Sequence, residues 1–473
     1  MLNDLSFLEA GQDWIPNTEK DRLALYELNH SLYENEHLEV LDMLLKVVYP
    51  EQEVNETVKR VFINLYRSVS KLWADLLFSE SPTISNVTDE TTEDYLNALI
   101  KATKLWKTAR KVAIDVSRYG NGLFKIRNRN GKVVIEAVTP RLWFPVVNPD
   151  NINEILMHVI AYTFVENKVH YLKAEIHEIG RITHKLFIVD KDAGKIKEEI
   201  DLKTLARYAT LEPVEETKVD DFLIVPVSNS ADSEDPFGED DYTDINPIIS
   251  QIELHLSKLG KDLEEQGNLK YGPGTAVDEN GHVERGSYIV MLGGANKQDP
   301  PGVVTWTVQF EAVKEYISQL MFFFYMVGEI SPVMFDPNKT VASDLSGISL
   351  KRLMQRMISK AGRLAEDFDE TIKRVFAIAA QLEGKELKEF EIDWQDGIAD
   401  DIAERVETAQ KAGVQQTMSQ KTAIAFVQKL EGKPLEDELA EISEEQKSKT
   451  VLPLSDLYPE EENDEENQND NEE

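Results

Sequence analysis

The sequence contains no cysteine, which excludes disulfide bonds, thiolate metal sites and cysteine nucleophiles. This absence suits a protein that works in a reducing cytoplasm, or in a particle that gains nothing from disulfides. Three catalytic motifs are also absent: the phosphate-binding loop G-x-x-x-x-G-K-[ST], the nucleophile elbow G-x-S-x-G and the zinc helix H-E-x-x-H. We therefore expect no enzymatic activity, no cofactor and no metal.

Long hydrophobic runs are missing as well. The most apolar stretch, residues 316–326, contains Ser318 and Gln319 and is far shorter than the roughly 20 residues that a membrane-spanning helix needs. The first 17 residues have no basic region followed by an apolar one, as a signal peptide would have. The sequence predicts neither a membrane span nor a secretion signal.

Basic residues are scarce relative to acidic ones. The chain has 51 Lys and Arg against 87 Asp and Glu, a formal net charge of −36. Tight DNA binding is disfavoured, because neutralisation of phosphates by Lys and Arg supplies most of that affinity. Such a charge remains compatible with a protein past which DNA slides. The tail at 459–473 has nine acids and no basic or apolar residue, so we expect it to be disordered and interpret it as a solubilising segment, with DNA mimicry or repulsion as the alternative.

Apolar periodicity predicts an α+β fold, mainly α, with several lobes because 473 residues exceed one core. Residues 1–125 are predicted mostly helical, with apolar stripes at 38–48 and 58–77 and a break at 78–82. From 123 to 227 the period shortens towards that of strands. Asn130-Gly131 lies between two strand-like runs and predicts a hairpin.

The segment 231–244 carries seven acids and no base, in a spacing that is not that of a calcium loop. We expect a solvated connector. A helix follows, with Asn246 as its N-cap, Pro247 in the first turn and Gly267 at its end.

Residues 268–308 are rich in Gly and Pro and contain short strand-like runs. The helix after them is apolar on two faces, which implies burial on both sides. The turn residues at 331–347 predict a loop. An apolar repeat from Leu350 to Leu382 then predicts a helix of more than about 50 Å at about 1.5 Å per residue. A strand at 390–394 and helical segments through 398–447 complete the prediction.

His170, His177 and His184 lie seven residues apart. In one extended segment that spacing alternates faces, so we expect these side chains not to converge and interpret them as surface or core histidines.

Several segments, in order along residues 60–450, resemble the portal protein family of tailed double-stranded DNA phages. RYGNGLFK (118–125) with VTPRLWFPVVNPD (138–150) resembles the family's Tyr-Gly-x-Gly hairpin and Pro-containing strand. PFGEDDYTDINPIISQIELHLSKL (236–259) resembles the approach to its first stem helix, although Glu239-Asp240 stands where the family usually has Ser or Arg-Ser before the acid. SGISLKRLMQRMISKAGRL (346–364) resembles the helix after the tunnel loop, and KAGVQQTMSQKTAIAFV (411–427) with EDELAEISEEQ (436–446) resembles the crown.

The resemblance implies a multi-domain portal fold assembled as a ring, typically of twelve subunits and of thirteen in some isolated rings, around a channel for DNA packaging and ejection. It implies the following partners: double-stranded DNA, the terminase large subunit, a head–tail adaptor, the major capsid protein and a scaffolding protein. It also implies a place at the capsid portal vertex of the virion, after assembly in the host bacterial cytoplasm. The expected regions are wing (1–244), first stem helix (245–267), clip (268–308), second stem helix (309–330), tunnel loop (331–347), long tunnel or wing helix and strand (348–397), crown (398–450) and disordered acidic tail (451–473).

Candidate residues follow from these regions. Asn338, Lys339 and Thr340 of the tunnel loop, with Lys351, Arg352 and Arg356 of the next helix, are candidates for contact with DNA in the channel. The loop is as readily a plain surface turn. Arg352, Arg356 and Arg363 share a helical face, and that basic segment can instead pair with acids of another subunit such as Glu366, Asp367 or Asp369.

Aromatic residues supply the candidate contacts with other proteins. Tyr271, Tyr288 and Trp306 are candidate clip contacts for a partner, with core packing as the alternative, and Phe322, Phe323 and Phe324 are candidates for packing between subunits.

Three alternative functions remain open from the sequence. The first is another phage head protein, such as a minor head or scaffolding protein. The second is a magnesium-dependent nuclease using Asp240, Asp241 and Asp244. The third is an acidic adaptor for basic proteins.

Overall fold

The computed structural model describes residues 1–36, 61–85, 87, 89–129, 131–230, 235–266, 270–272, 288–290, 302–303, 310–334, 352–394 and short helical pieces within 406–444. Residues 1–344 and 350–398 form one compact unit, and residues 345–349 and 399–473 form a second. In the second unit residues 406–411 are helical and Ala409 is buried. The predicted apolar stripe at 38–48, the end of a helix at Gly267 and the acidic tail lie outside the described residues.

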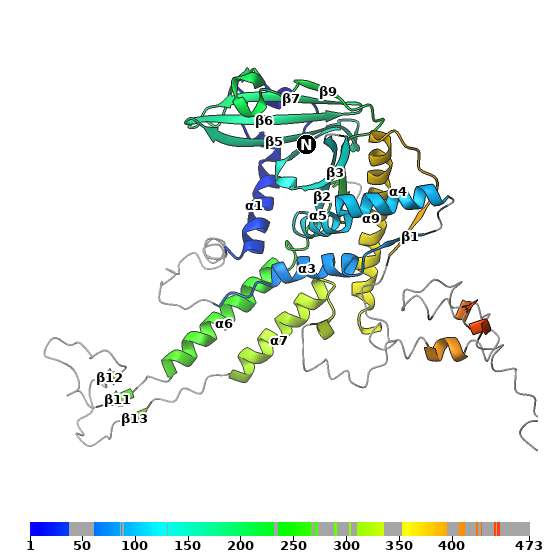
Figure 1. Cartoon of the computed structure of the whole chain (residues 1–473). Coiled ribbons are helices and arrows are strands. Elements are labelled where there is room, and N and C mark those ends of the chain that lie inside the picture. Colours follow the sequence, from blue (N-terminus) through cyan, green and yellow to red (C-terminus); the bar gives the residue numbers. More distant parts are fainter. Residues whose placement is uncertain are drawn as a thin grey trace, which may run out of the picture. The chain divides into compact units, whose positions relative to one another are not determined.

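The first unit mixes helices and strands, as the periodicity predicts (Figure 1). Its long helices are α1 (Lys20–Glu34), α3 (Leu65–Phe78), α4 (Glu90–Thr103), α5 (Leu105–Tyr119), α6 (Asn246–Gln266), α7 (Phe310–Val327) and α9 (Gln355–Leu382). Its strands are β1 (Thr83–Ser85), β2 (Asn121–Arg129), β3 (Lys132–Val138), β4 (Trp143–Asn148), β5 (Asn151–Glu166), β6 (Val169–Glu178), β7 (Arg181–Val189), β8 (Ile196–Ile200), β9 (Val214–Glu216), β10 (Ile224–Ser228), β11 (Lys270–Gly272), β12 (Tyr288–Val290), β13 (Gly302–Val303) and β14 (Glu391–Asp393).

Four sheets organise these strands. The largest is antiparallel, in the order β4-β5-β6-β7-β8, with β9 added beside β7. A second sheet has the order β10-β2-β3, and its β2–β3 hairpin turns at Gly131, whose φ of 78° is one that glycine adopts without strain. The hairpin prediction at Asn130-Gly131 is therefore confirmed. The two small sheets are β1-β14 and β12-β11-β13.

The main core lies where α3, α5 and α9 cover the β10-β2-β3 sheet. Phe78 at the end of α3 contacts Phe368 of α9 and Trp394, with ring centroids 5.3 and 5.7 Å apart. Trp73, Phe124 and Phe376 are each at most 1% exposed in the same core. Burial of large aromatic side chains at this density holds α9 rigidly against the sheet.

The prediction of a solvated connector is wrong for residues 235–244. Tyr242 is fully buried, and its hydroxyl lies 2.6 Å from the Ser70 hydroxyl of α3. Asn229 N donates to the Gly120 carbonyl (2.7 Å), and Asp241 N donates to the Ser117 carbonyl (2.8 Å). The segment thus packs against the end of α5 through the Asp241 N–H and against α3 through the buried Tyr242 side chain.

The prediction that Asn246 is the N-cap of α6 is also wrong. Asn246 is inside α6, since its N–H donates to the Tyr242 carbonyl (2.8 Å), and its side chain accepts from the Tyr66 hydroxyl (2.6 Å). Asp240 Oδ1 accepts instead from the N–H groups of Tyr242 and Thr243, at 2.8 Å each, so the helical turn starts earlier.

The long helix is shorter than expected. α9 has 28 residues, about 42 Å at about 1.5 Å per residue. Residues 352–353 are helical, but Met354 leaves the helical conformation at φ −97° and ψ 4°. Met354 is buried and the Ser331 hydroxyl donates to the Leu353 carbonyl (3.2 Å), so the chain turns into the subunit at this point.

Candidate assembly and channel surfaces

Helices α6 and α7 lie side by side and are joined through the β12-β11-β13 sheet (Figure 1). The chain leaves along α6 and returns along α7, so the two helices are antiparallel. The ring of His255 in α6 contacts that of Tyr316 in α7, with centroids 4.9 Å apart. This helix–sheet–helix arrangement occupies the ranges predicted as first stem helix, clip and second stem helix.

The surface of α7 carries more large apolar side chains than a solvated helix needs. Phe322 is 61% exposed and Phe323 is 45% exposed. The other large apolar residues that α7 leaves exposed are Phe310, Tyr316, Met326 and Val327. Among the described residues no helix is long and apolar enough to cross a membrane. Large apolar side chains exposed in this number on one helix are typical of a protein–protein contact.

Phe324 does not belong to this surface. It is 1% exposed and lies in the main core of its own subunit. The prediction that it packs against a neighbouring subunit is wrong, because consecutive helical residues point about 100° apart and Phe324 falls on the inner face. Phe322 and Phe323 remain available for that contact.

The basic segment around α9 is partly used inside the subunit. Lys360 Nζ lies 2.7 Å from Asp241 Oδ1, with side chains only 12% and 4% exposed, and 4.7 Å from the Trp73 ring centre. Arg363 pairs with Glu329 of the same chain at 2.7 Å. The alternative partners predicted for this segment, Glu366, Asp367 and Asp369, are not its partners within the subunit.

Arg352 and Arg356 are the freer bases of that segment. Arg352 is exposed, and the Arg356 side chain is 65% exposed, 3.9 Å from Glu329. These two candidates for DNA contact therefore reach solvent.

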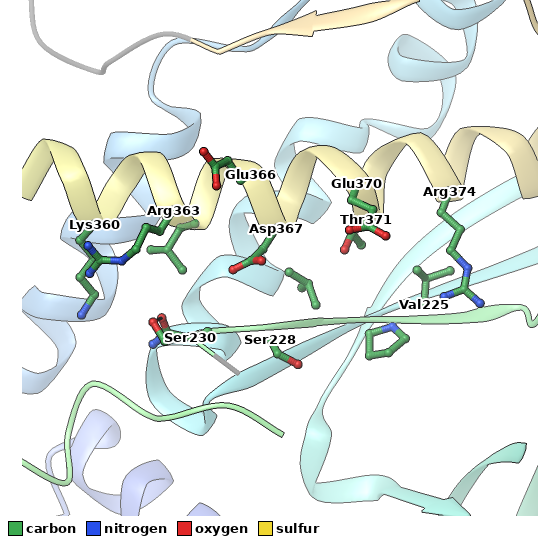
Figure 2. A pocket seen from close by; sticks show the side chains of 14 residues that line it. Val225, Ser228, Ser230, Lys360, Arg363, Glu366, Asp367, Glu370, Thr371 and Arg374 are labelled. Carbon is green, nitrogen blue, oxygen red and sulfur yellow. Dashed lines mark hydrogen bonds between the residues drawn. The ribbon is translucent and has the colours of Figure 1, made fainter. Parts of the chain in front are cut away.

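Between α9 and β10 lies an open pocket of about 430 Å³ (Figure 2). Helix α9 contributes Lys360, Arg363, Glu366, Asp367, Glu370, Thr371 and Arg374, and the strand side contributes residues 225–230. Figure 2 shows Asp367 pointing from the helix towards Ser228 and Ser230 of the strand side. No sequence pattern indicates this pocket, because the pocket depends on which strand packs beside α9.

The remaining sequence-predicted site residues are placed only in part. Tyr271 and Tyr288 lie on the adjacent parallel strands β11 and β12, where Lys270 is opposite Tyr288 and Tyr271 is opposite Ile289. The side chains of these two tyrosines lie outside the described part of the structure. Five other candidates lie outside it entirely: Trp306, Asn338, Lys339, Thr340 and Lys351. Their roles stay predictions.

The histidines behave differently from the expectation. His177 on β6 is opposite His158 on β5, and Glu175, on the same face of β6, is opposite His184 on β7. His177 and His184 therefore share a face, because the turn at Gly180 reverses the chain between them. His170 lies on the other face of β6, as expected.

These residues form a buried polar cluster in the large sheet. His184 Nδ1 lies 3.2 Å from Lys173 Nζ, and Glu175 forms an ion pair with Lys125. Trp143 Nε1 donates to His158 Nδ1 (3.1 Å). Burial lowers the pKa of His158 to about 3 and that of Lys173 to about 8. The histidines are thus neutral members of the core at neutral pH.

The acids of the nuclease alternative serve the fold. Asp240 accepts backbone hydrogen bonds at the start of α6, and Asp241 holds Lys360. Asp244 lines a separate surface pocket beside α1. Over the described ranges, no group of three or more His, Asp or Glu side chains is arranged to hold a metal ion.

Comparison with known proteins gives a specific family match. The family model described as "Phage portal protein, SPP1 Gp6-like" matches residues 12–450. No curated protein matches. A solved structure titled "Neck of native GTA particle computed with C12 symmetry" is similar at 10% sequence identity and a TM-score of 0.43, covering 78% of this chain and 90% of that chain. Because the family model spans nearly the whole sequence, the chain belongs to the phage portal protein family and is a structural component of the phage particle.

Proposed function

We propose that copies of this chain close into a ring at the capsid vertex and that double-stranded DNA passes through the ring during packaging and ejection. The observation that carries this proposal is the antiparallel α6–α7 pair around a small sheet, with exposed aromatic residues on α7, in a chain that belongs to the portal family. An exposed apolar row of this kind needs a neighbour to cover it. In a ring each subunit presents one face to the next subunit and a different face to the previous one.

The regions then take the following roles. Helices α6 and α7 form the stem, the β11–β13 segment forms the clip, and residues 331–347 form a loop that projects towards the channel. Residues 1–244 with α9 and β14 form the wing, and residues 398–450 form the crown. The number of subunits is about a dozen, as is usual for the family.

The ring is a passive conduit. ATP hydrolysis belongs to a terminase motor docked on the clip, where Tyr271, Tyr288 and Trp306 are the proposed contacts. The other proposed partners are the head–tail adaptor, the major capsid protein and the scaffolding protein. Asn338, Lys339 and Thr340, with Lys351, Arg352 and Arg356, are proposed to touch DNA transiently, consistent with the strongly acidic chain.

The first test is the mass and symmetry of the purified protein, by native mass spectrometry and negative-stain imaging. Rings of about a dozen copies with a central hole are expected, because exposed apolar surface drives association. A compact dimer with magnesium-dependent nuclease activity would contradict the proposal. The first alternative, a minor head or scaffolding protein, would not close into such rings alone.

The second test addresses the interface. The double variant Phe322→Ser/Phe323→Ser should lose ring assembly while keeping its secondary structure, since both side chains are largely exposed in the single subunit. The matched control is Val165→Ser/Ile179→Ser, which removes two side chains of similar exposure (57% and 59%) from the large sheet and should leave the ring intact. Equal assembly of the two variants would rule out α7 as the subunit contact.

A further inference from the structure

The pocket between α9 and β10 holds three carboxylates without a counter-charge. Glu366, Asp367 and Glu370 lie within five residues of one helix, and none of them makes a hydrogen bond or ion pair within the part of the chain that the structure describes. Burial raises the pKa of Asp367, and the charges of Glu366 and Glu370 raise it further. All three side chains are exposed, so water screens part of their mutual repulsion, but no ion-pair partner within the described residues removes it.

The bases that line the same pocket are already paired with other acids. Lys360 binds Asp241 at 2.7 Å, and Arg363 binds Glu329 at 2.7 Å. Arg374 binds Asp221 through two nitrogens, at 2.7 and 2.5 Å. Glu366, Asp367 and Glu370 are therefore left without a salt bridge of their own among the described residues, although Arg374 also attracts Glu370.

A second observation points to a missing ligand. Thr371 lines the pocket, is only 7% exposed, and its hydroxyl makes no hydrogen bond with any described residue. Its hydroxyl faces an open pocket and can donate to, or accept from, a group that enters it. With Ser228 and Ser230 opposite, the pocket offers carboxylate and hydroxyl acceptors to one donor group (Figure 2).

The acceptors suit a guanidinium better than a metal ion. No three carboxylates or imidazoles of the described residues converge closely enough to coordinate a metal. A planar guanidinium instead presents five N–H donors spread over a fork and can donate to carboxylates and hydroxyls that lie in more than one direction.

The occupant that the chain itself supplies is the basic start of the same helix. Arg352 is exposed and Arg356 is 65% exposed, and Arg356 lies no closer than 3.9 Å to its acid Glu329. Arg352 lies just before Met354 and Arg356 lies in the first turn of α9, so two bases precede the acids of Glu366–Glu370 along this part of the chain. In a ring, where contacts are head-to-tail, the basic end of one copy can meet the acidic pocket of the next.

We propose that the α9–β10 pocket, through Glu366, Asp367, Glu370 and Thr371, receives Arg352 or Arg356 of a neighbouring copy of this chain. This inference rests on the proposed ring. It assigns the pocket as a polar contact between subunits, separate from the apolar contact along α7. Such a contact fixes the register of neighbouring subunits, because misplaced like charges repel each other.

The test uses two charge-reversal variants of the full chain, Asp367→Lys/Glu370→Lys and Arg352→Glu/Arg356→Glu. Each variant alone places like charges across every contact, so each should fail to form rings in native mass spectrometry while its circular dichroism stays unchanged. Mixed in equal amounts, they should form rings in which the two variants alternate, because each then meets a complementary neighbour. The mass of the mixed ring reports that composition directly.

A matched control is Asp94→Lys/Glu386→Lys, which makes the same change in charge at exposed positions away from the pocket and should assemble normally. Rings from either reversal variant alone, or failure of the mixture to assemble, would overturn the proposal. So would loss of wild-type rings on addition of EDTA, which would mean that the pocket holds a divalent cation. Absence of rings in the wild-type protein would instead contradict the proposed function itself.

Discussion

The buried ion pair between Lys360 and Asp241 should be the most sensitive electrostatic contact of the main core. Its nitrogen and oxygen are 2.7 Å apart, and the side chains are 12% and 4% exposed. Replacing Lys360 with Met keeps most of the volume but leaves the Asp241 carboxylate buried without its counter-charge. Removal of one partner from a buried pair costs about 3–5 kcal/mol.

The lower part of that range applies here. Asn229 Nδ2 still donates to Asp241 Oδ1 at 3.1 Å, so the carboxylate keeps one hydrogen bond. We expect Lys360→Met to lower the free energy of unfolding by about 3 kcal/mol, roughly a hundredfold in the folding equilibrium. Urea denaturation followed by tryptophan fluorescence measures this loss. Trp73 is a suitable probe, because its ring centre lies 4.7 Å from Lys360 Nζ.

The control is on the same helix. Lys373 pairs with Asp369 at 2.7 Å, four residues away, with side chains 39% and 26% exposed. Lys373→Met should cost only about 0.3–0.5 kcal/mol, as for other surface pairs on helices. Adding Asp241→Asn to Lys360→Met should recover part of the loss, since the buried group is then neutral. Equal losses from Lys360→Met and Lys373→Met, or no recovery with Asp241→Asn, would refute the reasoning.

Other perturbations test the remaining core. Burial lowers the pKa of His158 to about 3 from an ordinary value near 6.5, so the unfolded chain takes up this proton first as the pH falls. The stability that neutral His158 contributes is complete above pH 6.5 and is lost as the pH falls towards 3, by on the order of a few kcal/mol. His158→Gln should therefore weaken the dependence of the unfolding free energy on pH, measured by urea titrations between pH 7 and 4.5. An unchanged dependence would assign it to other groups. Gly238→Ala should destabilise the subunit by more than about 1 kcal/mol, because φ is 77° and a Cβ would lie 2.5 Å from the Asn229 carbonyl oxygen. Gly362→Ala in α9, where a Cβ meets nothing within 4 Å, should instead raise the free energy of unfolding by up to about 1 kcal/mol and so raise the urea midpoint. A lower midpoint would point to an unrecognised contact at this position.

Local patterns predicted the local elements of this fold. The Asn130-Gly131 pair determines a hairpin through backbone conformations within a few residues, and the apolar stripe from Ile248 to Leu263 marks α6 in the same way. Both elements were found in the expected part of the chain: β2 and β3 flank Gly131, and α6 begins at Asn246. Family-like segments added the order of the regions, which periodicity alone does not supply.

Contacts between distant segments could not be predicted. Asp241 looked like one acid among seven in a polar stretch, and only the packing of that stretch against α5 and α9 shows that it binds a lysine 119 residues away. His177 and His184 looked divergent because an extended chain was assumed between them, whereas the turn at Gly180 brings them to one face. In both cases the neighbours of a side chain depend on how the chain folds back on itself, which the spacing of residues in the sequence does not show.

The same distinction changes how the basic segment of α9 should be interpreted. By sequence it is a row of five bases without an acid between them, and a row of that kind predicts contact with phosphates. In the fold, Lys360 is enclosed with Asp241 and Arg363 is neutralised by Glu329, so the charge available to a ligand is confined to the start of the row. Effects on DNA passage should therefore come from whichever of Arg352 and Arg356 is not held in the pocket of a neighbouring copy, while a change at Lys360 should first lower stability. A variant at Lys360 that altered packaging without altering the urea midpoint would show that the enclosed pair opens to DNA.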